Sequence, residues 1–210
     1  MSGTISIDVI VDVVCPWCFV GKRELDLALN TLGREKFSVM YRPYQLSPET
    51  PKQGVDRKVY YEKKFGNSPE LEKMRGYLTT RGRDLGIKFD FESPCLIANT
   101  LDVHRLIRWA HGAGCEEFVI ERLMQDYFEH SQFIGDHEYL MNVAAQAGMD
   151  RAIVEKLLSS GADADKVTSE INQARSLGVT GVPFYIIDQK SAIVGAEPAN
   201  QLIEKIIPFL

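Results

Sequence analysis

Two cysteines separated by two residues, in the segment Cys15-Pro16-Trp17-Cys18, lie at the junction of a strand-like run and a helical pattern. The preceding run, residues 5–13, is largely apolar and predicts a buried strand. Beyond the cysteines, apolar residues recur three and four positions apart, which predicts a helix from about Pro16 to Leu32. Extended backwards, this stripe reaches Cys18. We therefore expect Cys18 on the buried face of the helix and Cys15 at its first position, accessible to solvent.

This position favours redox chemistry at the two thiols. A helix N-terminus offers unpaired N–H groups and the positive end of the helix dipole, and both stabilise a thiolate relative to a thiol. Such a thiolate attacks a disulfide, and the second thiol then resolves the mixed disulfide. Because a Cys-x-x-Cys motif beside a strand–helix pattern is typical of redox proteins, the sequence predicts a dithiol/disulfide centre at Cys15 and Cys18. The alternatives are half of a zinc site and a structural pair.

The other cysteines and the histidines do not suggest a metal site. Cys95 and Cys115 belong to no Cys-x-x-Cys pair, whereas a four-cysteine zinc site usually uses two close pairs. The histidines lack a zinc-finger spacing, so we expect no metal, and we expect Cys95 and Cys115 to be small apolar residues. Asp12 precedes Cys15 by three residues and could relay a proton to Cys18, although a solvated aspartate at the strand end is the favoured interpretation.

The charge balance argues against several classes of partner. The net charge of the 210 residues is −5, and no basic face of the kind needed for nucleic acid is evident. No apolar run approaches the roughly 18 residues of a membrane span. The N-terminus shows no secretory signal, so we expect a cytoplasmic protein. In that compartment a Cys-x-x-Cys motif is more often catalytic or metal-binding than structural.

The remaining chain alternates between a sheet-forming part and a helical block. We expect a second strand at residues 37–44, a charged helical stretch at 56–86, and helices at 97–110, 116–128, 139–147, 152–158 and 163–177. A hairpin of residues 184–187 and 192–194 and a last helix ending at 207 follow. This order predicts an α/β thioredoxin-like fold, with a mixed central sheet and an inserted all-helical domain. The thioredoxin-like domain would comprise residues 1–50 and 162–210, and the insertion residues 51–161.

A second motif stands immediately before the hairpin. In Gly178-Val179-Thr180-Gly181-Val182-Pro183 a proline precedes a strand, and two glycines lie within five residues of it. X–Pro bonds are the only peptide bonds that are commonly cis, although a trans turn is the ordinary alternative. With a cis bond, the Val182 backbone could pair with an extended peptide.

Together these segments resemble DsbA-type oxidoreductases, most closely the FrnE-like cytosolic branch. The resemblance covers nearly the whole chain. It is carried by residues 12–18 with Gly21-Lys22, and by residues 44–46, 99–105, 178–184 and 195–198. It implies that Cys15 is the nucleophile, that Cys18 resolves, that the Val182-Pro183 loop is cis and faces them, and that the helical block caps the site. Pro16, Trp17, Val182 and Pro183 would bind substrate, and Asn99 would either line the cleft or serve packing.

Three functions remain open. The first is a thiol–disulfide oxidoreductase that acts on disulfide-containing proteins or small thiols, without a cofactor. The second is a glutathione-dependent enzyme like the kappa-class transferases and the 2-hydroxychromene-2-carboxylate isomerases, which usually have serine at the Cys15 position; glutathione would be the co-substrate. The third is a non-catalytic chaperone or binding module. Trp17 replaces the histidine of the periplasmic oxidase, so the resemblance implies a redox potential nearer that of thioredoxin. A homodimer is left open.

Overall fold

The computed structural model describes residues 4–66 and 68–210 and separates into two compact units. The sheet unit consists of the chain through Tyr44 together with Glu170–Leu210, and the helical unit is Gln45–Ser169. The division expected from the sequence placed the boundaries after residues 50 and 161. In the described residues, no helix has the length and apolar character needed to cross a bilayer.

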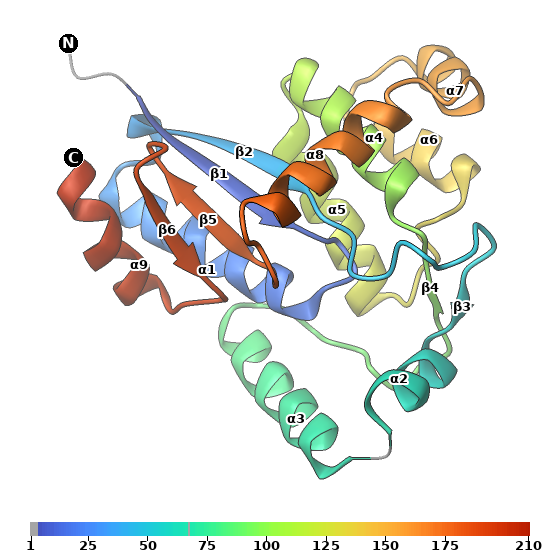
Figure 1. Cartoon of the computed structure of the whole chain (residues 1–210), viewed down its shortest axis with the longest axis horizontal. Helices are drawn as coiled ribbons and strands as arrows, with labels where there is room; N and C mark the ends of the chain where they lie inside the picture. Colours follow the sequence, from blue (N-terminus) through green and yellow to red (C-terminus); the bar gives the residue numbers. More distant parts are fainter. Residues whose placement is uncertain (1–3, 67) are drawn as a thin grey trace. The chain divides into compact units, whose positions relative to one another are not determined.

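The sheet unit is built on one mixed sheet, as the sequence predicts. Its strands are β1 (Ile5–Val11), β2 (Phe37–Pro43), β5 (Phe184–Ile187) and β6 (Ser191–Val194), in the order β2-β1-β5-β6. β1 and β2 are parallel, whereas β5 is antiparallel to both β1 and β6. Helices α1 (Pro16–Leu32) and α9 (Ala199–Ile206) contact each other; in Figure 1 α1 passes behind the strands and α9 lies beside β6.

The β1–α1 connection follows directly from the local sequence. β1 is buried over most of its length, and Val9 is fully buried at its centre. α1 begins at Pro16, which suits a first helical turn, and ends before Gly33, whose φ of 95° is unfavourable for other residues. β1 ends at Val11, two residues before the predicted end, because the chain then turns so that the Cys15 N–H donates to the Asp12 carbonyl at 3.0 Å.

The helical unit contains successive amphipathic helices and a short two-stranded ladder. The helices are α2 (Arg57–Phe65), α3 (Pro69–Asp84), α4 (Leu101–Gly112), α5 (Glu116–Glu129), α6 (His137–Gln146) and α7 (Arg151–Ser159). The ladder pairs β3 (Val55–Asp56) with β4 (Leu96–Ile97), and α8 (Ala164–Ser176) continues into the sheet unit. Short 3-10 turns occur at Arg34–Lys36 and Ile207–Phe209.

One buried arginine ties several of these helical elements together. The Arg105 side chain is only 2% exposed. Its Nε donates to the Ala162 carbonyl at 2.6 Å, and its Nη2 donates to the Leu157 carbonyl. Its Nη1 donates to Asp102 at 2.6 Å. Asp102 belongs to α4, Leu157 to the last turn of α7, and Ala162 to the loop that follows α7. Arg105 therefore fixes α4 against the end of α7 and this loop.

Candidate active site

Cys15 and Cys18 lie at the N-terminus of α1, immediately after β1. Cys15 is the N-cap residue, one position before the helix, and Cys18 lies in the first turn, where its N–H donates to the Cys15 carbonyl at 3.0 Å. Cys18 is fully buried, as predicted. The prediction that Cys15 meets solvent was wrong, because its exposed fraction is only 4%. Its backbone is extended (φ −92°, ψ 114°), and its side chain packs toward the loop before β5.

The Val182-Pro183 segment lies directly against the first thiol. The Cys15 thiol donates to the Val182 carbonyl, with 3.6 Å between Sγ and the oxygen. The Val182–Pro183 peptide bond is cis. On the other side of the proline, the Gly195 N–H donates to the Pro183 carbonyl at 2.9 Å. Residues that are 167 positions apart in sequence are therefore brought together at one reactive sulfur.

The environment of Cys18 keeps it in the thiol form. Burial is the main cause that raises its pKa well above the ordinary value, and the hydrogen bond and the charge of Cys15 act in the same direction. The charge of Asp12 raises the pKa further, while a hydrogen bond with the Asp12 backbone opposes the rise. Asp12 itself is 1% exposed, so the expectation of a solvated aspartate was wrong. A buried carboxyl group therefore lies beside the pair of thiols.

The inner face of α1 rests closely on β5 at Gly21. A Cβ added to Gly21 would lie 2.3 Å from the Tyr185 hydroxyl and 2.8 Å from Cγ of Pro183. Tyr185 is completely buried. Gly21 therefore allows α1 to approach the proline that faces Cys15, one helical turn beyond Cys18.

We expect Gly21→Ala to lower the free energy of unfolding by up to about 2 kcal/mol. Helix propensity favours alanine by about 1 kcal/mol, but overpacking against the rigid Tyr185 and Pro183 costs about 1–3 kcal/mol or more. Urea denaturation measures the difference. Gly76→Ala in α3 is the matched control, because a Cβ there meets nothing within 4 Å, and it should stabilise the protein by up to about 1 kcal/mol. Equal effects of the two substitutions would contradict this packing.

Asn99 is placed in the helical unit, and its side chain is engaged in local structure. Its Oδ1 accepts from the Gln45 side chain at 3.0 Å and from the Leu101 N–H at 3.1 Å. Its Nδ2 donates to the carbonyls of Pro48 (3.3 Å) and Thr50 (2.7 Å). These bonds fix the start of α4 against residues 45–50, which is the packing role. Contact with a substrate remains a prediction for Asn99, as it does for Pro16, which is buried, and Trp17, which is half-buried.

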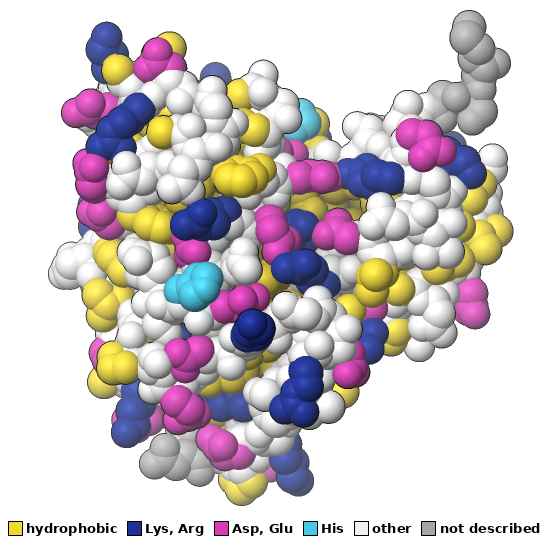
Figure 2. Space-filling model, turned by 180° about the vertical axis from the view of Figure 1, so that it is seen from behind, with side chains coloured by type: hydrophobic (Ala, Val, Ile, Leu, Met, Phe, Trp, Pro, Cys, Tyr) yellow, Lys and Arg dark blue, Asp and Glu magenta, His cyan; other side chains and the backbone are white. Residues whose placement is uncertain are grey.

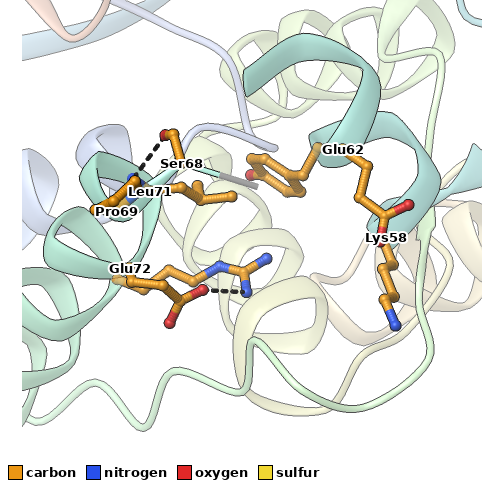
Figure 3. A pocket seen from close by; sticks show the side chains of 8 residues that line it. Lys58, Glu62, Ser68, Pro69, Leu71 and Glu72 are labelled. Carbon is orange, nitrogen blue, oxygen red and sulfur yellow. Dashed lines mark hydrogen bonds and ion pairs between the residues drawn. The ribbon is translucent and has the colours of Figure 1, made fainter. Parts of the chain in front are cut away.

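Two cavities in the helical unit are lined by residues other than the cysteines. One, of ≈ 400 Å³, is lined by residues of α2 and α3. Glu72 pairs with Arg75 at 3.5 Å there, and Figure 3 shows Ser68 capping the turn at Leu71. The other, of ≈ 620 Å³, is lined by residues that include Asn99 and the hydrogen-bonded pair Asp102–His137. Within the part of the chain that is described, His, Cys, Asp and Glu form no cluster suited to a metal ion.

Comparison with known proteins agrees with this geometry. Residues 6–206 match the family model of the DSBA-like thioredoxin domain. The chain belongs to this family. It is 24% identical over 205 residues to the uncharacterized protein YwbO of Bacillus subtilis (strain 168), covering 97% of this chain and 96% of YwbO. The DsbA-like fold expected from the sequence is thereby confirmed.

Two solved structures share the fold over nearly the whole chain. A probable DsbA oxidoreductase from Streptomyces coelicolor is 27% identical, with a TM-score of 0.88, and 98% of this chain and 89% of that chain are covered. A 2-hydroxychromene-2-carboxylate isomerase is 16% identical, with a TM-score of 0.71, and 97% and 94% of the two chains are covered. Solved structures with this fold therefore include a probable DsbA oxidoreductase and an isomerase.

Two buried polar residues, one on α1 and one on β5, were not anticipated from the sequence. Tyr185 is the second residue of β5, and the short apolar run around it predicts an ordinary strand residue. Glu24 is 1% exposed, and its carboxylate accepts from the Ala199 N–H at 2.9 Å, at the N-terminus of α9. The sequence could have pointed to Glu24, because it lies three residues after Gly21 and its charged side chain therefore falls next to the buried stripe of α1.

Proposed function

We propose that the protein is a thiol–disulfide oxidoreductase in which Cys15 is the nucleophile and Cys18 the resolving thiol. The observation that carries this proposal is the position of the Cys15 sulfur, at the positive end of α1 and 3.6 Å from the Val182 carbonyl, with Cys18 buried one turn further on. This asymmetry gives the two thiols different roles, because the pKa of Cys18 is raised by burial and by Cys15.

The exchange proceeds in two balanced steps. The Cys15 thiolate attacks one sulfur of a substrate disulfide, so that a Cys15–substrate disulfide forms and the other substrate sulfur leaves as a thiolate that takes a proton from solvent. Cys18 then loses its proton and attacks the Cys15 sulfur, which releases the second substrate sulfur. Two electrons pass from the pair of thiols to the substrate. The reverse sequence oxidises a substrate dithiol.

The expected substrates are disulfide-containing proteins or small disulfides. The Val182 carbonyl is already within reach of the reacting sulfur, which supports contacts from Val182 and Pro183 to a substrate backbone, with Pro16 and Trp17 beside them. We propose a cytoplasmic location and no nucleic-acid partner. On the face shown in Figure 2, basic and acidic side chains are interspersed and form no basic patch, which supports the proposal that nucleic acid is not a partner.

A trapping experiment tests this division of roles. Cys18→Ser, incubated with oxidised glutathione, should accumulate a glutathione adduct on Cys15, because the resolving thiol is missing. Cys15→Ser is the matched control and should form no adduct at Cys18, which is fully buried. Peptide mass spectrometry locates the adduct. Adduct formation at Cys18 with Cys15 unmodified would refute the proposed roles.

A glutathione-dependent transferase or isomerase is the second candidate function. It is favoured by the structural likeness to a 2-hydroxychromene-2-carboxylate isomerase over 97% of this chain, a likeness that concerns the fold. In such an enzyme glutathione would bind without closing a Cys15–Cys18 disulfide. The two functions therefore differ in whether the pair of cysteines cycles between dithiol and disulfide.

Asp12→Asn should slow the closing of Cys18 onto a Cys15 mixed disulfide by about tenfold or more, if the Asp12 carboxylate accepts the Cys18 proton. The direction of the change in the rate of closing distinguishes two roles of Asp12. The Asp12 charge raises the pKa of Cys18, so its removal lowers this pKa, which alone would increase the thiolate fraction and accelerate closing. Quenched-flow measurement of closing, from pH 6 to pH 9, decides between the two effects. Faster closing in Asp12→Asn would show that Asp12 acts only through its charge.

A further inference from the structure

The Tyr185 hydroxyl is buried in the centre of the sheet unit beneath the helix that carries the thiols. Tyr185 pairs with Val9 of β1 and Ile193 of β6, and its side chain has no exposed surface. Its oxygen has no hydrogen-bond partner in the residues that the structure describes. A buried hydroxyl without a partner is destabilising, so its presence in a native protein calls for an explanation.

This hydroxyl lies on the same side of α1 as the resolving thiol. A Cβ added to Gly21 would lie only 2.3 Å from the Tyr185 oxygen. Cys18 precedes Gly21 by three residues, and residues at this spacing are neighbours on one face of a helix. After burial, the charge of Cys18 is the largest influence that raises the pKa of Tyr185. The phenol and the Cys18 sulfur therefore share one buried environment.

We propose that the Tyr185 hydroxyl donates a hydrogen bond to the Cys18 sulfur when that sulfur ionises to attack the Cys15 mixed disulfide. This inference rests on the proposed oxidoreductase function and deepens it. In the closing step the Cys18 S–H bond breaks, the thiolate forms a bond to the Cys15 sulfur, and the substrate sulfur leaves with the electron pair of the mixed disulfide and takes up a proton in place of the one that Cys18 lost. The phenol keeps its own proton throughout and stabilises the transient charge.

The ionisable side chains that act on Cys18 are Cys15 and Asp12, and neither replaces this donor. The charge of Asp12 opposes the ionisation of Cys18, as does that of Cys15 in the free dithiol, but Cys15 carries no charge in the mixed disulfide. Glu24 and Asp26 of α1 and Tyr41 of β2 influence Tyr185. Ionised carboxylates only accept hydrogen bonds, and the Glu24 carboxylate already accepts from the Ala199 N–H while that of Asp26 accepts from Lys22 at 2.7 Å. The Tyr185 hydroxyl lies under α1 and can donate its O–H to the Cys18 sulfur.

The first test measures the ionisation of Cys18 without requiring any exchange activity. In a Cys15→Ser background with ¹³Cβ-labelled cysteine, NMR titration follows Cys18, whose signal is assigned by its loss on Cys18→Ser. Adding Tyr185→Phe should raise the pKa of Cys18, because the thiolate loses a donor. Tyr139→Phe is the matched control, since its hydroxyl donates to Asp126 in the helical unit at 2.8 Å, and it should leave this titration unchanged. An unchanged Cys18 titration in folded Tyr185→Phe would overturn the proposal.

The second test measures closing of a preformed Cys15–glutathione mixed disulfide in otherwise native protein. Tyr185→Phe should slow closing by about threefold at neutral pH for each tenfold loss of thiolate, since that loss is offset by only about threefold in intrinsic nucleophilicity. The variant should be as stable as the native protein or more so, because it removes an unpartnered buried hydroxyl. Unchanged closing would overturn the proposal. A raised pKa of Cys18 in a protein that shows no exchange would support the hydrogen bond and refute the oxidoreductase function instead.

Discussion

Replacing Cys15 with serine is expected to lower the rate of disulfide exchange by at least about 10³-fold, as is usual when the nucleophile is removed. Serine is nearly isosteric with cysteine, but its hydroxyl does not ionise near neutral pH and cannot form a disulfide. Cys15 is the sulfur that lies at the N-terminus of α1 and against Val182. Cys18 cannot take its place, because it is fully buried and its raised pKa keeps it in the thiol form.

Exchange with a small aromatic disulfide, followed by absorbance, measures this loss. Cys95→Ser is the matched control. Cys95 is a free thiol that is also buried, and burial raises its pKa, but it lies in the helical unit. This variant should exchange at the native rate. Circular dichroism verifies that both variants are folded. Retention of most exchange in folded Cys15→Ser would refute the role of Cys15 and leave a binding or chaperone function.

Replacing Arg105 with methionine is expected to lower the free energy of unfolding of the helical unit by about 3–5 kcal/mol, as is usual when one partner of a buried ion pair is removed. Methionine fills part of the volume, but it cannot donate to Asp102 or to the carbonyls of Leu157 and Ala162. The carbonyls would be left buried without these donors. Asp102 would keep the hydrogen bond from His137, at 2.7 Å.

Urea denaturation followed by far-ultraviolet circular dichroism measures this effect. Arg151→Met is the matched control. The Arg151 side chain is 39% exposed and pairs with Glu138 across the surface, so its replacement should change the free energy of unfolding by no more than about 0.5 kcal/mol. A loss below about 1 kcal/mol in Arg105→Met would contradict the structural role assigned to this arginine.

The sequence predicted those elements whose ends carry their own local signals. α1 extends over the predicted residues because Pro16 starts it and Gly33 ends it. β5 has the predicted bounds because a proline and a polar turn enclose a short apolar run. α4, by contrast, begins at Leu101 rather than at residue 97. Ile97 pairs with Val55 in a two-residue ladder, which is too short to produce a pattern, and the Asn99 oxygen accepts the Leu101 N–H.

The same distinction applies to the site. The spacing of Cys15 and Cys18 is a local signal, and Pro183 is marked by the glycines before it. The burial of Asp12 is a property of tertiary structure, since nothing in the adjacent sequence distinguishes a buried strand-end carboxylate from a solvated one. The role proposed for Tyr185 depends on Gly21, which is more than 160 positions away, so it could be inferred only when α1 and β5 were seen together.

An equilibrium redox titration tests the central claim most directly. The protein is equilibrated in glutathione buffers of graded composition, acid-quenched and analysed by mass spectrometry. We expect one reversible two-electron couple that joins Cys15 to Cys18, absent in Cys15→Ser, with a potential nearer the roughly −270 mV of thioredoxin than that of a strong oxidase. Failure of the pair to close at any buffer composition would contradict it. A non-covalent glutathione complex with both thiols open would favour the transferase or isomerase instead.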